Sequence, residues 1–211
     1  MEHRFNAFRH LGLLGIISFL SYFLAVVFSP LAYPGYDWMS QAVSDLSAEG
    51  APSLGLWKQL SCLYGKCGII SIMAVAAFVH DEKIGNKVFR AGIYLFTLMN
   101  WISAVGYDLF PLSQAGMGMK TFQDFMHVYV VTAGVVITSI LSLVCIIIGG
   151  IMSRSEKSLA VFACLSLFMM ITGAVGSGMA PKAVFGIFER FSVFSATAFN
   201  AVLGFYLYKK W

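Results

Sequence analysis

Hydrophobic positions along the chain gather in six long runs that are separated by short polar segments. The runs lie at about residues 11–29, 57–79, 91–109, 125–151, 159–180 and 187–208. Each is close to or longer than the ~20 residues with which an α-helix crosses ~30 Å of hydrocarbon. The pattern predicts an all-α membrane protein, a six-transmembrane-helix bundle in which residues 1–211 form a single integral membrane domain.

Composition points to the same class. Of the 211 residues, 59% are hydrophobic and 11% are charged, whereas about a quarter of the residues in a soluble domain are charged. One core cannot hold this much apolar surface, so the expected partner is the lipid bilayer, and nothing indicates nucleic-acid binding. The first run has no small-residue cleavage site before Pro30, so we expect it to remain as a span.

Lys and Arg predict the orientation of the spans. If the N-terminus is cytoplasmic, nine of the 14 basic residues lie inside and five lie outside. The inner set is Arg4, Arg9, Lys83, Lys87, Arg90, Arg154, Lys157, Lys209 and Lys210, and the outer set is Lys58, Lys66, Lys120, Lys182 and Arg190. Because cytoplasmic loops carry an excess of Lys and Arg, we expect a multi-pass protein of the cell (inner) membrane with both termini cytoplasmic.

The longest connection joins the first two runs and reads PGYDWMSQAVSDLSAEGAPS. Asp37 suits the start of a helix and Gly50 suits its end. Trp38, Val43 and Leu46 recur at helical spacing on one face. We expect a short interfacial helix over Asp37–Glu49, on the outer surface or over the mouth of the bundle. The pattern leaves open whether this helix is a plain interfacial element or a functional lid.

Two titratable groups fall at the same end of neighbouring spans. Asp108 ends the third run within YDLFP, and His127 opens the fourth. Consecutive spans are antiparallel, so the two groups should lie at similar depth, and ionisable groups in spans tend to face the bundle interior and pair. They are the candidate catalytic residues. Thr121 and Asp124 have capping-box spacing, so Asp124 is expected to be structural.

Lys66 lies eight residues after Lys58 in the second run, about 12 Å deeper at 1.5 Å per residue. A lysine at that depth is costly unless its amine snorkels to the headgroups or meets a carboxylate. We expect an internal ion pair. The candidate partners are Asp108, Asp45 and Glu189.

Glu189 and Arg190 open the sixth run within FERF. Adjacent residues on a helix point in different directions, so one side chain can face the interior while the other faces lipid. A phosphate headgroup is the ordinary partner for Arg190. Glu189 is then expected to face inward, near Lys66 and His127.

Familiar metal and nucleophile motifs are missing. The sequence has no CxxC, HExxH, GxSxG or phosphate-binding glycine loop. Cys62 and Cys67 are five apart, which disfavours a disulfide or a zinc–thiolate site. Of the histidines in the spans, His127 is outer, whereas His10 and His80 lie at the inner edge, which disfavours a bis-histidine haem. The residues indicate no particular cofactor.

Four short motifs together resemble a known family. MSQAVSDLSAEGAPS after the first span, YDLFP at the end of the third, a histidine opening the fourth and FERF opening the sixth are similar to the bacterial and archaeal multispan proteins of domain-of-unknown-function family 998. SDLSA and FP are also distantly similar to the Frag1/DRAM family. Neither resemblance implies a chemistry. The resemblance to family 998 marks these recurrent positions: Ser44, Asp45, Asp108, Pro111, His127, Glu189 and Arg190. The chain looks unlike the alkaline ceramidase and adiponectin-receptor superfamily, which has a three-histidine zinc site.

Three functions remain open. The first is a membrane-embedded enzyme acting on a lipid or other amphiphile, with acid–base work by Asp108 and His127. Its candidate substrate-binding residues are Lys66, Asp45, Glu189, Arg190 and Ser44. The second is a small-molecule binding or transport protein, such as a substrate-capturing transporter subunit. The third is a structural role, in which the polar groups hold the span ends together. The oligomeric state stays open.

One geometric expectation underlies the first two functions. Asp108, His127 and Glu189 should converge around one polar pocket at the outer end, roofed by the Asp37–Glu49 helix. A metal ion held by these three side chains is a minor variant, since oxygen-rich ligation with one imidazole is chemically allowed.

Overall fold

The computed structural model describes residues 8–116 and 119–210, so Arg4 lies outside the described part. Across these ranges the chain is helical and contains no strand. Six helical segments are long and apolar enough to cross a membrane, which confirms the six-span all-α bundle. They are Phe8–Ala32, Leu54–Asp81, Lys87–Leu109, Phe122–Met152, Lys157–Met179 and Lys182–Lys210.

Several spans are built from more than one element. The first contains α2 (Leu13–Phe28) and a 3₁₀ turn (Ser29–Ala32), the second α3 (Leu54–Leu60) and α4 (Tyr64–Asp81), and the third α5 (Lys87–Leu109). The fourth contains α6 (Phe122–Phe125), a π-helical segment (Met126–Val131) and α7 (Thr132–Met152). After a 3₁₀ turn (Arg154–Glu156) come α8 (Lys157–Met179), another such turn (Lys182–Val184) and α9 (Phe185–Lys210).

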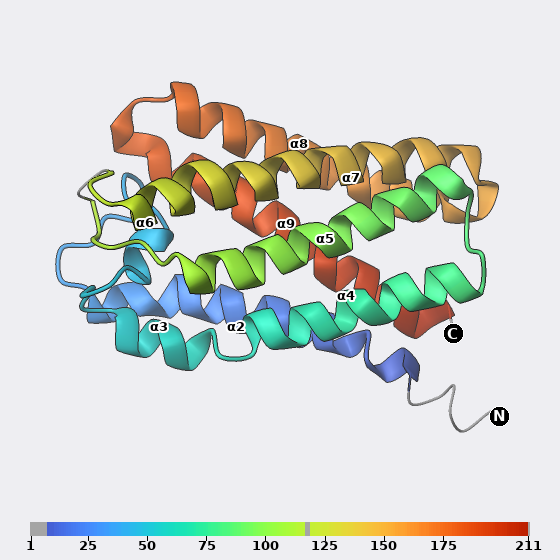
Figure 1. The fold of residues 1–211 in the computed structure, drawn as a ribbon, viewed down its shortest axis with the longest axis horizontal. Helices are drawn as coiled ribbons and strands as arrows, with labels where there is room; N and C mark the ends of the chain where they lie inside the picture. Colours follow the sequence, from blue (N-terminus) through green and yellow to red (C-terminus); the bar gives the residue numbers. More distant parts are fainter. Residues whose placement is uncertain (1–7, 117–118, 211) are drawn as a thin grey trace.

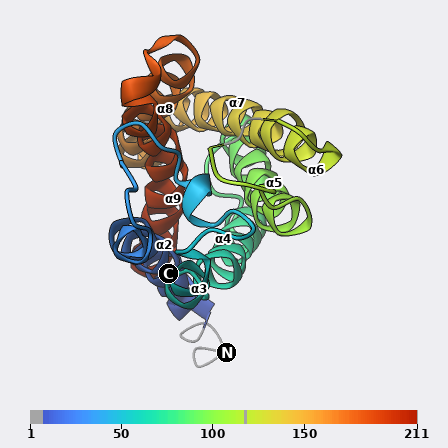
Figure 2. The same ribbon diagram turned by 90° about the vertical axis from the view of Figure 1, so that its left-hand side faces the viewer.

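The helices run lengthwise beside one another and form an irregular ring when viewed from one end (Figures 1 and 2). Helix α5 packs on α7, α8 on α9, and α2 on both α4 and α9. The chain enters and leaves at the same end of the bundle (Figure 1). We call this the termini end. The opposite end carries residues 33–53, 110–116 and 119–121 and is called the loop end.

The main apolar core fills the half of the bundle toward the termini end. It is built by α4, α5, α7, α8 and α9, and its largest members are fully buried. The Phe96 ring meets the Phe199 ring edge-on, with centroids 5.2 Å apart. A second, smaller cluster of Tyr22, Val26 and Val43 lies toward the loop end. The large apolar core therefore stops short of the loop end.

Helices α2 and α9 approach so closely that small residues are required between them. A Cβ on Gly204 would lie 2.2 Å from the Gly12 carbonyl oxygen. The Ser71 hydroxyl of α4 donates to the same carbonyl at 3.2 Å. Glycine at such contacts lets the helix backbones approach, as is common between membrane helices.

We therefore expect Gly204→Ala to destabilise the protein by about 1–3 kcal/mol, the usual penalty for overpacking a well-packed contact. Gly178→Ala is the matched control, because a Cβ on Gly178 meets nothing within 4 Å. Thermal unfolding in detergent measures both variants. Equal melting temperatures for the two variants would show that the helices separate readily at this contact.

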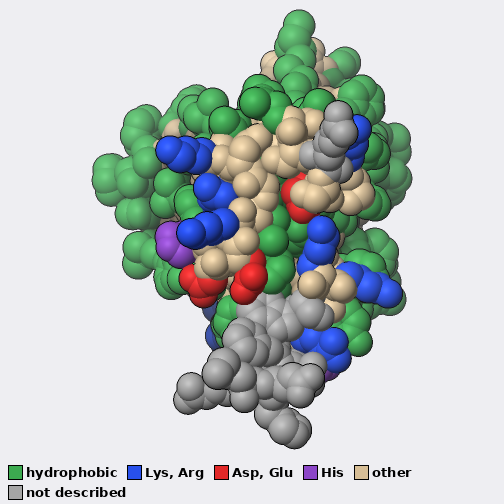
Figure 3. Space-filling model, turned by 90° about the vertical axis from the view of Figure 1, so that its right-hand side faces the viewer, with side chains coloured by type: hydrophobic (Ala, Val, Ile, Leu, Met, Phe, Trp, Pro, Cys, Tyr) green, Lys and Arg blue, Asp and Glu red, His purple; other side chains and the backbone are tan. Residues whose placement is uncertain are grey.

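Lys and Arg side chains gather on the termini end, as Figure 3 shows. Exposed cations there include Lys83, Lys87, Lys157, Lys209 and Lys210. This distribution follows the sequence count and favours a cytoplasmic termini end by the positive-inside rule.

Cysteine labelling tests this orientation. Gln114 and Ser155 are exposed at the loop end and the termini end respectively. In a background without the exposed Cys62 and Cys164, a membrane-impermeant maleimide should label Gln114→Cys and not Ser155→Cys in intact cells. Labelling of Ser155→Cys alone would reverse the orientation.

Candidate functional site

Residues 33–53 cover the loop end, and we call this segment the plug. The expected Asp37–Glu49 helix is wrong as a continuous element, because its helical part is one 3₁₀ turn, Ser44–Leu46. That turn lies over the middle of the ring of helices (Figure 2). Its side chains are well buried, with Leu46 fully inaccessible and Asp45 only 6% exposed.

Tertiary hydrogen bonds explain why the plug is not a helix. The Val43 backbone N–H donates to Glu189 Oε2 of α9 at 2.5 Å, so it is not available to a carbonyl four residues earlier. Asp37 Oδ1 accepts from the Met39 N–H, and the Gln41 N–H donates to the Asp37 carbonyl, so this aspartate organises one local turn. The Ser40 hydroxyl that donates to Asp37 lowers the pKa of its carboxyl.

Arg190 holds the same side of the plug to α9. Its guanidinium donates to the Gln41 carbonyl at 3.2 Å and to the Tyr36 hydroxyl at 2.7 Å. The Tyr36 hydroxyl in turn donates to the Ala42 carbonyl at 2.8 Å. Burial raises the pKa of Tyr36 to about 12, so the phenol keeps its proton at neutral pH. Arg190 therefore has protein partners in addition to any headgroup.

The other side of the plug is bound to the loop between α5 and α6. Asp45 Oδ1 accepts from the Gly116 N–H at 2.9 Å, and Oδ2 accepts from the Ala42 N–H at 3.1 Å. The Glu49 N–H donates to the Leu112 carbonyl at 2.8 Å. Asp45 thus acts as a structural acceptor, whereas Ser44 stays half-buried within the 3₁₀ turn.

Asp124 is confirmed as a capping residue, and it does more than the motif predicts. The Thr121 side chain and Asp124 form a complete capping box at the start of α6. Asp124 also accepts from the Ser113 N–H at 2.9 Å and from the Ser113 hydroxyl at 2.8 Å. It is only 1% exposed. One carboxylate therefore fixes both the helix start and the preceding loop.

His127 lies in the π-helical segment and is 8% exposed. Its Nδ1 is 2.7 Å from the Phe110 carbonyl oxygen. A carbonyl only accepts, so Nδ1 carries the proton, and Nε2 of the neutral ring is an acceptor with no hydrogen-bond partner among the described residues. The Tyr107 ring packs on the imidazole with centroids 4.8 Å apart.

Thr132 accounts for the π-helical turn. Its backbone N–H and its hydroxyl both donate to the His127 carbonyl five residues earlier, the hydroxyl at 2.8 Å. The hydroxyl proton is used in that bond, so the Tyr107 hydroxyl, 3.0 Å away, donates to Thr132. Tyr107, Thr132 and His127 thus form one connected unit, and such π-bulges are frequent at functional sites.

Asp108 does not join His127. It is exposed on α5, and no described residue forms a hydrogen bond or an ion pair with it. The reason is angular: Tyr107 faces His127, and the next residue of a helix points about 100° away. The carbonyl oxygen of Phe110, at the end of α5, is the partner of His127 in place of the Asp108 carboxylate.

Lys66 is exposed, and the predicted internal ion pair is wrong because no described carboxylate pairs with its amine. The second span has 28 residues, in which a turn separates α3 from α4, and this is more than the ~20 residues that cross the hydrocarbon. Part of the span therefore lies at headgroup level, which shortens the reach of the Lys66 amine to the interface.

A tyrosine cluster beneath the plug was missed by sequence reasoning. Tyr22 lies within electrostatic range of Tyr64, Tyr107 and Glu189, and its ring centroid is 4.5 Å from that of Tyr64. These side chains come from α2, α4, α5 and α9. The sequence does contain a sign of this cluster, which is one tyrosine in the loop-end part of each of the first three spans. A hydropathy pattern does not reveal it, because tyrosine counts as hydrophobic.

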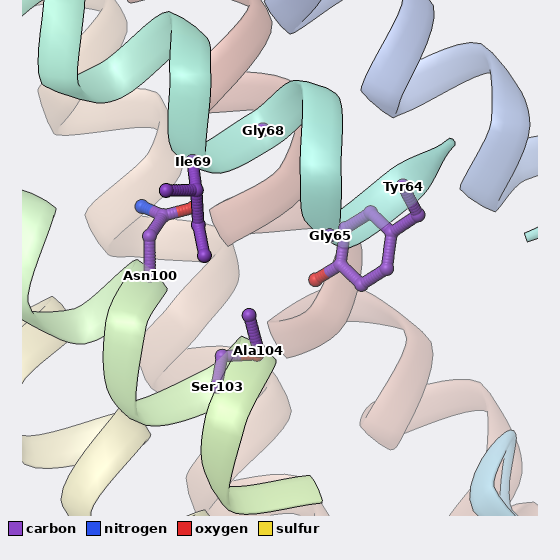
Figure 4. Close-up of a pocket in the computed structure, with 7 residues that line it drawn as sticks. All are labelled: Tyr64, Gly65, Gly68, Ile69, Asn100, Ser103 and Ala104. Atoms are coloured by element: carbon purple, nitrogen blue, oxygen red, sulfur yellow. The ribbon is translucent and has the colours of Figure 1, made fainter. Parts of the chain in front are cut away.

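Cavities at this end are small. Tyr64, Asn100 and Ser103 border a space of about 10 Å³ between α4 and α5 (Figure 4), room for a single water molecule. A larger cleft of about 260 Å³ opens between Tyr33, residues 49–52 and residues 113–115. In the described part of the chain, no three His, Cys, Asp or Glu side chains are close enough to hold a metal ion, so the Asp108–His127–Glu189 variant is wrong.

Comparison with known proteins adds one decisive match. Residues 16–206 match the family described as "Protein of unknown function (DUF998)". The chain belongs to this family. No curated protein and no solved structure matches it. The distant likeness to the Frag1/DRAM family stays a prediction, and membership of family 998 brings no assigned activity to the loop end.

The geometry predicts opposite behaviour for two aspartates. We expect Asp124→Ala to lower stability by about 1–2 kcal/mol, because it removes a helix cap and the acceptor for the Ser113 N–H and hydroxyl. Asp108→Ala should change stability by less than about 0.5 kcal/mol, as exposed substitutions usually do. Thermal unfolding in detergent checks both. A large loss in Asp108→Ala would mean that this carboxylate is bonded in the folded protein.

Proposed function

We propose that this family 998 protein binds a lipid or another amphiphile at its loop end, which faces the outside of the cell membrane. The observation that carries the proposal is the orientation of His127. Its Nδ1–H is bonded to Phe110, and Nε2 is left as an oriented acceptor. A histidine held by its other nitrogen in this way is suited to accept a hydrogen bond or a proton from a bound molecule.

Exposed apolar side chains at the loop end support an amphiphilic ligand. Leu109 of α5, Phe122 and Phe125 of α6 and Tyr129 of the π-helical segment are all largely exposed. The Phe125 and Tyr129 rings lie 5.5 Å apart. Aromatic residues at the end of a span are typical of the membrane interface. Acyl chains would pack on this surface, and a polar group of the same molecule would bond to His127.

An enzymatic form of the proposal uses His127 as the base. Asp108 then remains the candidate acid from sequence, acting from the exposed end of α5. Lys66 and Arg190 are the candidate groups for an anionic headgroup, and Lys66 is exposed for that role. Glu189, Asp45 and Ser44 serve this site through the plug, by holding it over the bundle.

A structural role is the second candidate, and one observation favours it. The carboxylates of three residues accept hydrogen bonds from backbone N–H groups of other segments: Asp45, Asp124 and Glu189. Such bonds hold the ends of the spans together. Transport has less support, since a dense apolar core fills the termini half of the bundle.

His127→Asn separates binding from structure. The Asn amide can still donate to Phe110 near the position of Nδ1, but it removes the Nε2 acceptor. We expect lipid retained by the purified protein, measured by native mass spectrometry, to fall by about three- to tenfold, the worth of one hydrogen bond. His80→Asn is the control, since His80 bonds Tyr94 at the termini end.

The two candidate functions give different results in that experiment. Ligand binding predicts lost lipid with a melting temperature close to that of the wild type. The structural role predicts that lipid content is unchanged in His127→Asn, and that result would contradict the proposed function.

A further inference from the structure

The cleft of about 260 Å³ at the loop end is built by segments that other contacts hold in place. One wall, residues 49–52, is joined to the opposite loop by the bond from the Glu49 N–H to the Leu112 carbonyl. That loop is in turn held by Asp124, which binds both the N–H and the hydroxyl of Ser113. Tyr33, just after the first span, closes the third side.

Glu49 is the charged side chain that lines this cleft. It is exposed, and no described residue forms an ion pair or hydrogen bond with its carboxylate. The Glu49 backbone forms part of the cleft wall, and its carboxylate is available to bind a ligand. This distinguishes it from Asp45, Asp124 and Glu189, whose carboxylates are all occupied by backbone donors.

Tyr33 adds an aromatic side to the cleft. Its ring lies 5.5 Å from the Tyr36 ring, which in turn is 6.0 Å from the Arg190 guanidinium carbon. Tyr36 is therefore already occupied by a protein cation, whereas no protein cation lies over the Tyr33 ring among the described residues. An aromatic face beside a carboxylate attracts an ammonium group by two electrostatic effects.

We infer that this cleft binds an organic ammonium group, either as the amine headgroup of a lipid or as a free amine. The Glu49 carboxylate pairs with the cation, and the Tyr33 ring offers it a π-face. Gln114 is a further polar residue on the lining. An anionic ligand is disfavoured because Glu49 repels it. The volume suits a small headgroup and is below that of typical drug-sized pockets.

The cleft adjoins the His127 site through one short loop. The Phe110 carbonyl accepts from His127, and the Leu112 carbonyl accepts from Glu49 two residues later. The cleft and the His127 site therefore depend on the same short loop. The proposal that the ligand is an amine lipid rests on the proposed function. Binding of a free amine does not, because it depends on the cleft alone.

The experiment compares Glu49→Gln with Glu82→Gln, an exposed control at the termini end. Binding of tetramethylammonium and ethanolamine to the detergent-purified chain is measured by calorimetry. Binding of lipids with and without an amine headgroup is measured in nanodiscs. We expect Glu49→Gln to weaken ammonium binding about tenfold and Glu82→Gln to leave it unchanged. Binding should also weaken at high salt, because the site is exposed.

The possible results distinguish a free amine from an amine lipid as the ligand, and they distinguish the cleft site from the His127 site. Free amines that bind through Glu49 support the cleft as an amine site, and amine lipids alone that bind through Glu49 support it as a headgroup site. Absence of binding by either class, or equal affinity in Glu49→Gln, overturns the inference. Tyr33→Leu should also weaken binding. The free-amine measurement is made on the cleft variants alone, so failure of the proposed function at His127 is distinguishable from failure at the cleft.

Discussion

Backbone N–H groups of non-helical segments at the end of a membrane bundle need acceptors, and this constraint shapes the loop end. A buried N–H such as that of Val43 would cost several kcal/mol if it were left unsatisfied. Three carboxylates meet the need. Glu189 accepts from Val43, Asp45 accepts from Gly116, and Asp124 accepts from Ser113. Without them, the non-helical plug could not be buried over the bundle, and neither the cleft nor the environment of His127 would be defined.

The interior of the bundle differs between its two halves. Toward the termini, large apolar side chains such as Phe89, Phe96 and Phe199 dominate it. Toward the loops, tyrosines, a histidine and carboxylates replace them. The π-helical turn at His127 belongs to this second half, where the Thr132 hydroxyl takes part in backbone bonding. Any chemistry at this end is therefore supported by a rigid apolar base.

Several predictions for single residues came from local sequence rules. Those that depend on neighbouring residues were confirmed, and those that depend on distant side chains were wrong. The Thr121–Asp124 capping box depends on residues three apart, so spacing alone identified it. The Lys66 ion pair and the Asp108–His127 contact depended on which way distant side chains point. One step along a helix turns a side chain by about 100°, and this rotation placed Tyr107 against His127 and left Asp108 exposed. The helix expected over Asp37–Glu49 failed because its N–H groups bond to other segments.

The sequence by itself determined the class of protein, the six spans and the bias of Lys and Arg toward one end, because these depend on hydropathy and charge summed over many residues. It also marked Glu189, Asp45 and His127 as notable positions. Only the tertiary structure decided what these side chains contact, that Tyr22, Tyr64 and Tyr107 gather beneath the plug, and that Glu49 lines a cleft. Such contacts join residues far apart along the chain, and helix rotation and loop path set them, which no local pattern encodes.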